Sequence, residues 1–426
     1  MFKEGTLSAQ VRIFYLDRKF QGISSVHRDS SAIGGHLKYE TASLNGLRMG
    51  VAFYTTNNLH INQHNIHDPS LLGTNEEAYS ILGEAYLGYD FSHLGYKTDM
   101  KIGYQRYDSP MIGSDDVRML PNTFRAYKLV SHDLKNITLQ IAHIDKIAYG
   151  TYSNLFTGGG IVSATSGYPA AGNYTTGKYY NLGQATVGKN TTGVTSFLIK
   201  YTNDYFHIRL SDDYAWDLYN TLYVDAGLSW NCLLNDNIHP FLQAQFIKQN
   251  SLGGHYMQYL SDSNDGTINS IYEGVKVGAK YAGFTAYLAY SQTGKNSVAD
   301  KQNNPYKNAI ITQFGGMPAY TAGMVTRHQF LAGAKASKLA AEYSFKQEGV
   351  NLVTSMYYIS VKMDKNSGFG VARTSKEPGF DIKYSPKSLK KLQLRVRGNF
   401  PRNFSEATPS SSKGWNEYRF IANYTF

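Results

Sequence analysis

The feature that most constrains the fold is a period of two in apolar and aromatic residues, repeated in many short segments. In the segment 415–426, WNEYRFIANYTF, the residues Tyr418, Phe420, Tyr424 and Phe426 share one phase, and polar residues occupy most of the other phase. Successive side chains of a β-strand point to opposite faces, so this pattern predicts a strand with one apolar and one polar face. Either a protein core or lipid must cover the apolar face.

The same alternation recurs along the whole chain. Many weak segments of this kind are typical of a transmembrane β-barrel, in which lipid-facing and lumen-facing residues alternate along each strand. Further strands are predicted around residues 7–15, 37–39, 47–53, 83–91, 100–104, 127–129, 137–141, 197–201, 206–210, 222–230, 242–246, 275–281, 284–290, 380–384 and 392–396.

The connections between these segments alternate in length, as expected when short turns line one rim of a barrel and long loops the other. We count 18 or 19 strands, depending on whether 328–345 forms one strand or two. A closed antiparallel barrel with both ends on one side needs an even number, so we predict 18. Short turns are predicted at 44–46, 203–205, 282–283 and 385–389, and long loops at 57–78, 147–191, 249–270, 293–325 and 401–414.

Neither a helical membrane protein nor a chain of several domains fits this composition. The mean hydropathy is −0.38, and the longest uncharged stretches, such as 147–177, are interrupted by Gly, Ser, Thr and Asn. They do not approach the ~20 apolar residues of a spanning helix. The 35 Tyr and 40 Gly are spread evenly and no linker divides the chain, so we expect one domain over 1–426.

A soluble β-sandwich or propeller is the alternative fold. It would have to explain why aromatic residues recur on the outer phase of so many strands, and why the sequence has no Trp/Gly blade repeat. We therefore predict an all-β, closed antiparallel transmembrane barrel with long loops partly folded into its lumen.

Basic residues are expected to face the lumen. The formal net charge is +10, and an Arg or Lys on the lipid face at mid-depth would cost roughly 2–4 kcal/mol. By parity the inward acids are fewer, namely Glu84, Asp225, Asp381 and Glu417, so the pore should attract anions. The inward bases expected by the same parity are Arg12, Lys38, Arg48, Lys128, Lys200, Arg209, Lys276, Lys280, Lys383, Arg395, Arg397 and Arg419.

Arg12, Arg395, Arg397 and Arg419 form the centre of the predicted ladder for solutes. The further ladder residues that we predict are Arg209, Lys128, Lys383 and Arg48. Arg395 and Arg397 occupy successive inward positions, and barrel closure makes the first strand a neighbour of the last. Guanidinium groups can donate two hydrogen bonds to one carboxylate, which suits a path for carboxylates. For each base, the alternative is an ion pair with a lumen acid or a lipopolysaccharide phosphate at the outer rim.

Loops are expected to form the other wall of the constriction. The segment 155–184 is rich in Gly, Ala, Ser and Tyr, and 314–323 (FGGMPAYTAG) is a second candidate. The TGGG sequence is not a P-loop, because no Lys-Ser/Thr follows at the required spacing. His60, His64 and His67 are interpreted as surface histidines, with adventitious metal binding as the alternative. We predict neither a dedicated metal site nor a cofactor.

The segment 103–145, GYQRYDSPMIGSDDVRMLPNTFRAYKLVSHDLKNITLQIAHID, resembles the OprD family of outer-membrane channels. Asp115, Asp116, Arg118 and Pro121 match the Asp-Asp-x-Arg-x-Leu-Pro loop of that family. From the residue types alone, we expect these acids and Arg118 to pair and fasten a loop rather than to act as acid and base.

The resemblance extends to both ends of the chain, through LSAQVRIFYLDRKF, SDDYAWDLYNTLYVDAGLSW, LQLRVRGNF and WNEYRFIANYTF, and is weakest at 146–190 and 290–335. It implies a monomeric barrel of 18 strands, narrowed by inward-folded loops. It also implies passage of small solutes, often carboxylates, along a ladder of basic residues.

The function expected from these observations is a passive, substrate-selective channel for small anionic or zwitterionic solutes. A general non-selective porin, an outer-membrane enzyme and a plugged structural barrel are the alternatives, and no Ser/His/Asp grouping at the outer rim favours the enzyme. We expect contact with outer-membrane lipid, lipopolysaccharide and, through Phe426, the assembly machinery, but not with nucleic acid. MFKEGTLSAQ lacks the features of a signal peptide, so we expect a mature bacterial outer-membrane protein whose signal has been removed.

Overall fold

The architecture is a single antiparallel sheet closed into a barrel, seen in a computed structural model. The sheet contains 19 strands in the described part of the chain. The structure describes residues 2–21, 26–156, 160–168, 174–252, 266–369, 372–404 and 414–426.

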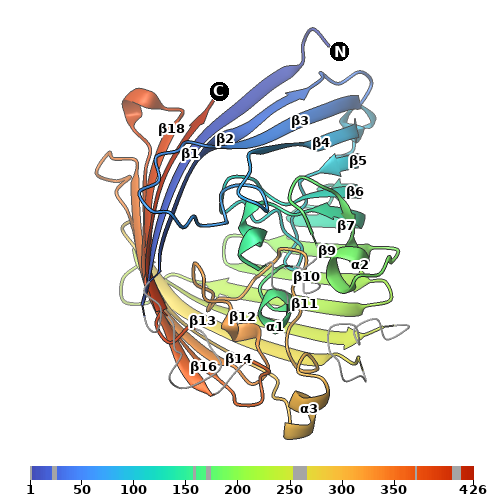
Figure 1. Ribbon diagram of the computed structural model, residues 1–426. Helices are drawn as coiled ribbons and strands as arrows, with labels where there is room; N and C mark the ends of the chain where they lie inside the picture. The colour runs from blue at the N-terminus through green and yellow to red at the C-terminus, as the bar shows by residue number, and fades with distance from the viewer. Residues whose placement is uncertain are drawn as a thin grey trace.

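The ring closes where the first strand meets the last. β1 (Thr6–Gln21) pairs with β2 (His27–Glu40) on one side and with β19 (Gly414–Thr425) on the other. β8 (Tyr180–Asn181) is a two-residue addition to β7 (Ile137–Ala148), which also pairs with β9 (Val194–Thr202). Without β8 the ring has 18 strands, so the predicted number is confirmed, and the two chain ends lie close together (Figure 1).

The remaining strands follow one another around the wall in chain order. Their bounds are β3 (Leu47–Asn58), β4 (Tyr79–Asp90), β5 (Thr98–Gln105), β6 (Thr123–Ser131), β10 (Phe206–Ala215), β11 (Tyr219–Ser229), β12 (His239–Ser251), β13 (Asn269–Tyr281), β14 (Phe284–Thr293), β15 (Lys335–Ser344), β16 (Leu352–Met363), β17 (Arg373–Tyr384) and β18 (Leu392–Asn399).

The helices of the described residues are short and lie in the connections. They are η1 (Phe91–Leu94), η2 (Thr151–Phe156), α1 (Gly160–Ala164), α2 (Leu182–Val187), α3 (Val298–Asn303), η4 (His328–Phe330) and η5 (Lys387–Leu389). None of the described helices is both long enough and apolar enough to span a bilayer.

The period of two in the sequence becomes an outward and an inward face. On β1, Val11 and Ile13 are exposed, whereas Arg12, Phe14 and Leu16 are buried. β19 shows the same alternation, with its aromatic phase outward. An outer face of this kind is suited to lipid, and an inner face that carries charge is suited to a pore.

The alternation of short turns and long loops is also confirmed. The turn between β13 and β14 consists of Ala282 and Gly283, both at positive φ (44° and 82°). Two successive residues at positive φ match the right-handed twist of paired strands, which explains why this hairpin is so tight.

The segment 328–345 forms one strand, as predicted, but that strand begins only at Lys335. Its first residues belong instead to the loop 294–334, and Phe330 and Leu331 are fully buried. These apolar side chains pack inside the barrel rather than facing lipid, which is why the sequence pattern extends beyond the strand.

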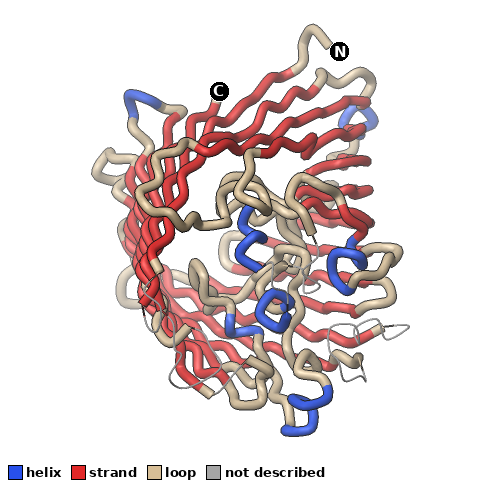
Figure 2. Tube along the Cα trace, in the orientation of Figure 1, coloured by secondary structure: helices blue, strands red, loops and turns tan. Residues whose placement is uncertain are grey.

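The core lies inside the barrel, between the wall and the loops. Figure 2 shows loops and short helices within the ring of strands. Ile112, Tyr149, Tyr168 and Phe314 come from three loops and pack in one buried cluster with wall residues such as Phe124. This packing positions the candidate site, because it holds the loops across the lumen.

Candidate functional site

The centre of the predicted ladder lies where the barrel closes, at the junction of β1 with β19 and its neighbour β18, which we name the seam. β1, β19 and β18 are neighbours; Arg12 is opposite Asn423, and Arg419 is opposite Arg397. Like charges directly opposite each other destabilise a sheet unless other groups offset them. Carboxylates from β17, β19 and two loops provide this compensation.

Glu417 of β19 is the centre of a buried charge cluster. It accepts hydrogen bonds from Nε of Arg18, at 2.6 Å, and from Nε of Arg419, and its Oε1 lies 3.7 Å from Nη2 of Arg118. Arg18 also pairs with Asp68, at 2.7 Å. The three arginines are 1–4% exposed, so these bonds hold them in place and the cluster carries more positive than negative charge.

Arg118 belongs to the loop between β5 and β6 rather than to a spanning strand. Burial, reinforced by the charge of Arg419, lowers the pKa of Arg118 to about 10, so the group stays charged at neutral pH. Its guanidinium carbon lies 5.8 Å from the ring centre of Phe14 and 4.9 Å from that of Tyr152. Nε donates to Oγ of Ser70 at 3.0 Å, so Arg118 links three segments inside the barrel.

The acids of the Asp-Asp-x-Arg motif bind the wall and a neighbouring loop. Asp116 accepts a hydrogen bond from Nη1 of Arg12 at 2.6 Å, and Asp115 lies 3.6 Å from Nη2 of Arg327. The expectation that these acids pair with Arg118 is wrong, because each meets a different cation that the folded lumen brings close. The motif still fastens its loop, through these tertiary contacts.

Pro121, the last motif residue, packs against the start of the next long loop. A Cβ at Gly150 would come within 2.2 Å of the Leu120 carbonyl oxygen and 2.7 Å of the Pro121 carbonyl carbon. Oγ1 of Thr151 accepts hydrogen bonds from the backbone N–H groups of Met119 and Leu120, at 3.1 and 3.3 Å. The end of the motif therefore requires a glycine beside it.

Arg395 and Arg397 share one carboxylate on β17. Arg395 donates Nε to Oδ1 of Asp381 at 2.8 Å and Nη2 to Oδ2, and Nε of Arg397 lies 3.4 Å from the same Oδ2. Lys383 is opposite Arg395 in the strand register. One carboxylate among three cations leaves this part of the wall positive.

The other predicted ladder residues lie elsewhere around the ring. Arg48 of β3 donates to Asp99. Nε of Arg209, on β10, lies 3.2 Å from Oδ1 of Asp225. Lys128 of β6 is not part of the seam either, so the structure does not bring all the predicted residues to one site.

A second group of cations lies on the inner face of β13 and β15. Lys276 and Lys338 are both opposite Ala289 of the intervening strand β14, and neither forms an ion pair with a carboxylate of the described residues. Their Nζ atoms lie 5.2 and 5.8 Å from the ring centre of Tyr287, so one aromatic ring stands between two lysines. We name these three residues the lysine–tyrosine platform.

Two further tyrosines border the lysine–tyrosine platform. Nζ of Lys276 lies 4.7 Å from the ring centre of Tyr320, and Nζ of Lys338 lies 5.2 Å from that of Tyr357. Lys338 also donates to the carbonyl oxygen of Ala322 at 2.8 Å. An ammonium group over an aromatic face is attracted to the ring electrostatically.

Strand parity predicted Lys276 as an inward base, but Lys338 and Arg18 were not among the predicted residues. Lys338 lies in KASKLAAEYS, where Leu339 is one of few large apolar residues to mark the outward phase. The signal that could have found it is position: Lys338 lies one residue before Leu339, and therefore on the opposite face.

Three loops meet inside the barrel to narrow it. The N–H of Gly113 donates to the Phe314 carbonyl oxygen at 2.9 Å, and the N–H of Thr312 donates to that of Ala164 at 2.8 Å. The predicted candidate 314–323 therefore lies across the lumen. The candidate 155–184 contributes Ala164, whereas its residues 157–159 and 169–173 lie outside the described part of the chain.

A closed barrel with an apolar outer face and loops folded into a charged lumen defines the class of outer-membrane porins. The family model described as outer membrane porin, OprD family, matches residues 2–426. The chain therefore belongs to the OprD family, and it is a protein of the bacterial outer membrane, as the sequence resemblance predicted.

Solved structures with the same fold come from Pseudomonas aeruginosa. OpdK with vanillate has 15% identity and a TM-score of 0.75, covering 100% of this chain and 99% of that one. OccK9 (OpdG) has 16% identity and a TM-score of 0.75 at the same coverage. OccK2 (OpdF) in complex with glucuronate has 14% identity, a TM-score of 0.71, and coverage of 100% and 98%. A search of curated protein sequences finds no match.

Proposed function

We propose that this porin is a passive channel selective for small solutes that carry a carboxylate. The observation that carries the proposal is the lysine–tyrosine platform: two lumen-facing ammonium groups on either side of one aromatic ring, with no carboxylate bound to them among the described residues. A solute carboxylate can supply the missing partner.

The energies favour a solute with both a charge and an apolar body. A hydrogen bond to a charged group contributes roughly 1.5–3 kcal/mol, and Tyr287, Tyr320 and Tyr357 offer aromatic surface beside the charge. The relatives OpdK and OccK2 were solved with vanillate and glucuronate, which are carboxylates.

The seam arginines have a different part in this proposal. Arg12, Arg397 and Arg419 are held by wall or loop groups, so they act mainly through their positive field, which draws anions towards the constriction. Arg395 is more exposed than these, and Arg48, Arg209, Lys128 and Lys383 extend the positive wall to other strands.

The test is the double substitution Lys276→Gln and Lys338→Gln, which keeps side-chain length and removes both charges. We expect the anion-to-cation permeability ratio in planar bilayers to fall. We also expect benzoate to enter proteoliposomes about tenfold more slowly, the effect of losing about 1.4 kcal/mol of binding, and glucose entry to be unchanged. Lys376→Gln is the control, because Lys376 is exposed and lies between the buried, inward Ser375 and Glu377.

Two outcomes would favour the alternatives. Equal slowing of benzoate and glucose would indicate a general porin whose permeability depends only on width. No passage of either solute through the wild-type protein would indicate a plugged structural barrel. Family and fold are those of a channel rather than an enzyme, and we propose no catalytic residues.

The same proposal includes the oligomeric state of the porin and the partners of its outer face. We propose a monomer that contacts lipid through its apolar outer face, where Val277, Leu288 and Leu339 are 50–58% exposed. The further partners that we propose are lipopolysaccharide and, through Phe426, the assembly machinery.

A further inference from the structure

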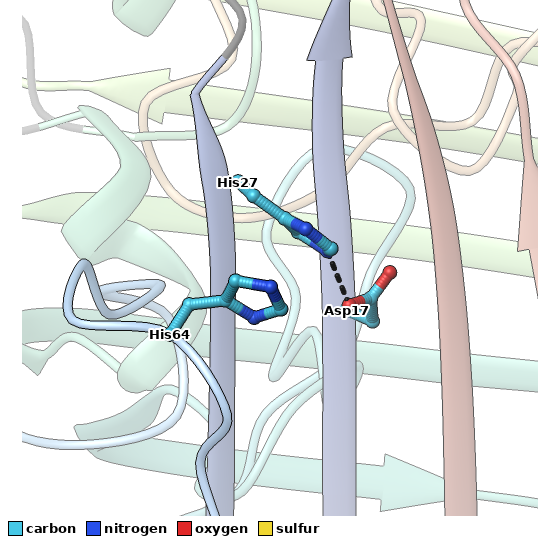
Figure 3. Close-up of side chains that lie close together, drawn as sticks. All are labelled: Asp17, His27 and His64. Carbon is cyan, nitrogen blue, oxygen red and sulfur yellow. Dashed lines mark hydrogen bonds and ion pairs between the residues drawn. The ribbon is translucent and has the colours of Figure 1, made fainter.

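Two histidines and one aspartate come together on the outside of the barrel. Asp17 belongs to β1, His27 to β2, and His64 to the loop 59–78 (Figure 3). Nε2 of His27 and Oδ2 of Asp17 are 2.6 Å apart, and the rings of His27 and His64 have centroids 3.5 Å apart. One ligand atom from each residue lies within 4.8 Å of the other two.

The strand register places this cluster away from the solute path. Asp17 is opposite Asp29, and His27 lies two residues before Asp29 on the same face of β2. Asp17 also shares its face of β1 with Val11 and Ile13, the outward, exposed residues. The cluster is therefore on the outer surface, near the loop end of the β1–β2 hairpin.

The histidine of the loop is held by a second carboxylate. Asp29 is fully buried; it accepts hydrogen bonds from the backbone N–H groups of Gln63, at 2.6 Å, and His64, at 3.1 Å. Its Oδ1 also lies 3.5 Å from Nδ1 of His64. Nδ1 of His64 has no hydrogen-bond partner among the described residues, so the backbone contacts with Asp29 position this histidine.

His64 does not group with the other histidines of its loop. Nδ1 of His67 lies 3.0 Å from Oε2 of Glu76, and His60 is exposed. Spacing along the loop therefore did not reveal the cluster, since its other two members are on strands.

The ligand set decides which cations fit. Two imidazole nitrogens and one carboxylate oxygen suit Zn²⁺ and, by the same chemistry, Cu²⁺ or Ni²⁺, whereas Ca²⁺ and Mg²⁺ prefer oxygen ligands throughout. Three protein ligands leave a fourth tetrahedral position for water. The side chains of Asp17, His27 and His64 are 25–31% exposed, so a cation can reach them from solution.

We infer that Asp17, His27 and His64 form a binding site for a divalent cation of the Zn²⁺ class, which fastens the loop 59–78 to the β1–β2 hairpin. The carboxylates of Asp17 and Asp29 offset the charge of the cation and of Lys19, which is opposite His27. The site is independent of the proposed solute path.

Fastening this part of the loop also affects the lumen. A few residues after His64, the same loop places Asp68 beside Arg18, at 2.7 Å, and Ser70 beside Arg118, at 3.0 Å. A cation on the outer surface would thus fix the loop at His64, while Asp68 and Ser70 of the same loop are bound inside the barrel.

The first test is titration of the full-length, tag-free protein in detergent with ZnCl₂, followed by calorimetry. We expect one saturable Zn²⁺ per barrel, no competition from excess Mg²⁺, and at least a tenfold loss of affinity in Asp17→Asn, His27→Gln and His64→Gln. His60→Asn is the matched control: it removes an exposed histidine from the same loop, and Asn tolerates its φ of 55°. Wild-type affinity in the three variants, or equal loss in the control, would overturn the proposal.

The second test uses Cu²⁺ as a spectroscopic probe and does not depend on affinity. Electron paramagnetic resonance should show coupling to two nitrogens in the wild type and to one in His64→Gln, in samples whose folded state is confirmed by the mobility of unheated protein in gels. Hydrogen exchange at residues 60–67 should slow when Zn²⁺ is added. An unchanged nitrogen count in His64→Gln, or unchanged exchange in the wild type, would exclude a cation that fastens this loop.

Discussion

Arg397 of β18 and Arg419 of β19 are directly opposite each other in the strand register, and each guanidinium group interacts with a different carboxylate. Asp381 lies 3.4 Å from Arg397, and Glu417 accepts a hydrogen bond from Arg419. The seam therefore keeps closely spaced positive charges by surrounding them with a smaller number of acids. Its stability and its selectivity should depend on the same residues.

The double substitution Arg395→Gln and Arg397→Gln should remove the local excess of positive charge, because only Lys383 and Asp381 keep their charges there. It leaves Asp381, 9% exposed, without its two arginines, so we expect a lower anion-to-cation permeability ratio and a less stable barrel. Adding Asp381→Asn should restore part of both properties, because the buried carboxylate is then neutral. Reversal potentials in a salt gradient should show the highest anion selectivity in the wild type, a lower one in the triple variant and the lowest in the double variant. A double variant as anion-selective as the wild type would contradict this role.

Replacing Glu417 by Gln should destabilise the protein strongly. The change leaves Arg18, Arg118 and Arg419 buried with less compensating charge, and breaking a buried ion pair costs about 3–5 kcal/mol. Urea unfolding in liposomes, followed by tryptophan fluorescence, measures the loss. Glu342→Gln is the control, because Glu342 is exposed on β15; equal stability of the two variants would show that the buried cluster contributes nothing.

A single methyl group at Gly316 should disturb the constriction. A Cβ there would come within 2.2 Å of the Met111 carbonyl carbon, whereas a Cβ at Gly113 would meet its nearest neighbour, in the facing loop, at 3.5 Å. We therefore expect Gly316→Ala to push the two loops apart and to raise single-channel conductance, and Gly113→Ala to leave it unchanged. Identical conductance in both variants would mean that this loop contact does not limit the pore.

The loop that carries His328 should loosen in acid. Burial, with a smaller contribution from Arg373, lowers the pKa of His328 to about 3, against an ordinary value of about 6.5. Only the neutral imidazole is favourable in this buried site. The contribution of His328 to the stability of the loop is therefore fully present above pH 6.5 and is lost as the pH drops from 6.5 towards 3. The protection of residues 324–332 from hydrogen exchange, measured relative to an unfolded chain at the same pH, should therefore fall over that range.

The variant His328→Phe provides the control for this pH effect, because Phe cannot be protonated and the site already contains Phe369 and Phe404, with ring centres 5.0 and 4.4 Å away. Glu377 binds the backbone of the same loop in both proteins, so its own protonation affects both alike. A pH dependence in His328→Phe equal to that of the wild type would assign the effect to Glu377.

The barrel and its number of strands could be predicted from the sequence because both depend on local rules. Residues such as Val11, Ile13 and Arg12 show which face meets lipid without any knowledge of the partner strand, since an inward or outward position depends only on parity. An even number of strands also predicts that the first strand pairs with the last. This prediction correctly placed Arg12, Arg397 and Arg419 on neighbouring strands.

Parity could not show which charges would be paired. Asp116 meets Arg12 across 104 positions of the chain, because a loop folds back into the lumen and carries its acid to the wall. Arg18 meets Glu417 across 399 positions, because barrel closure pairs β1 with β19 and places these two residues opposite each other. The lysine–tyrosine platform and the Asp17–His27–His64 cluster likewise join residues from separate strands and loops. The sequence by itself determined the faces of each strand and the excess of positive charge in the lumen. Only the tertiary structure decided which cations stay open to a solute, because that depends on where distant loops place their carboxylates.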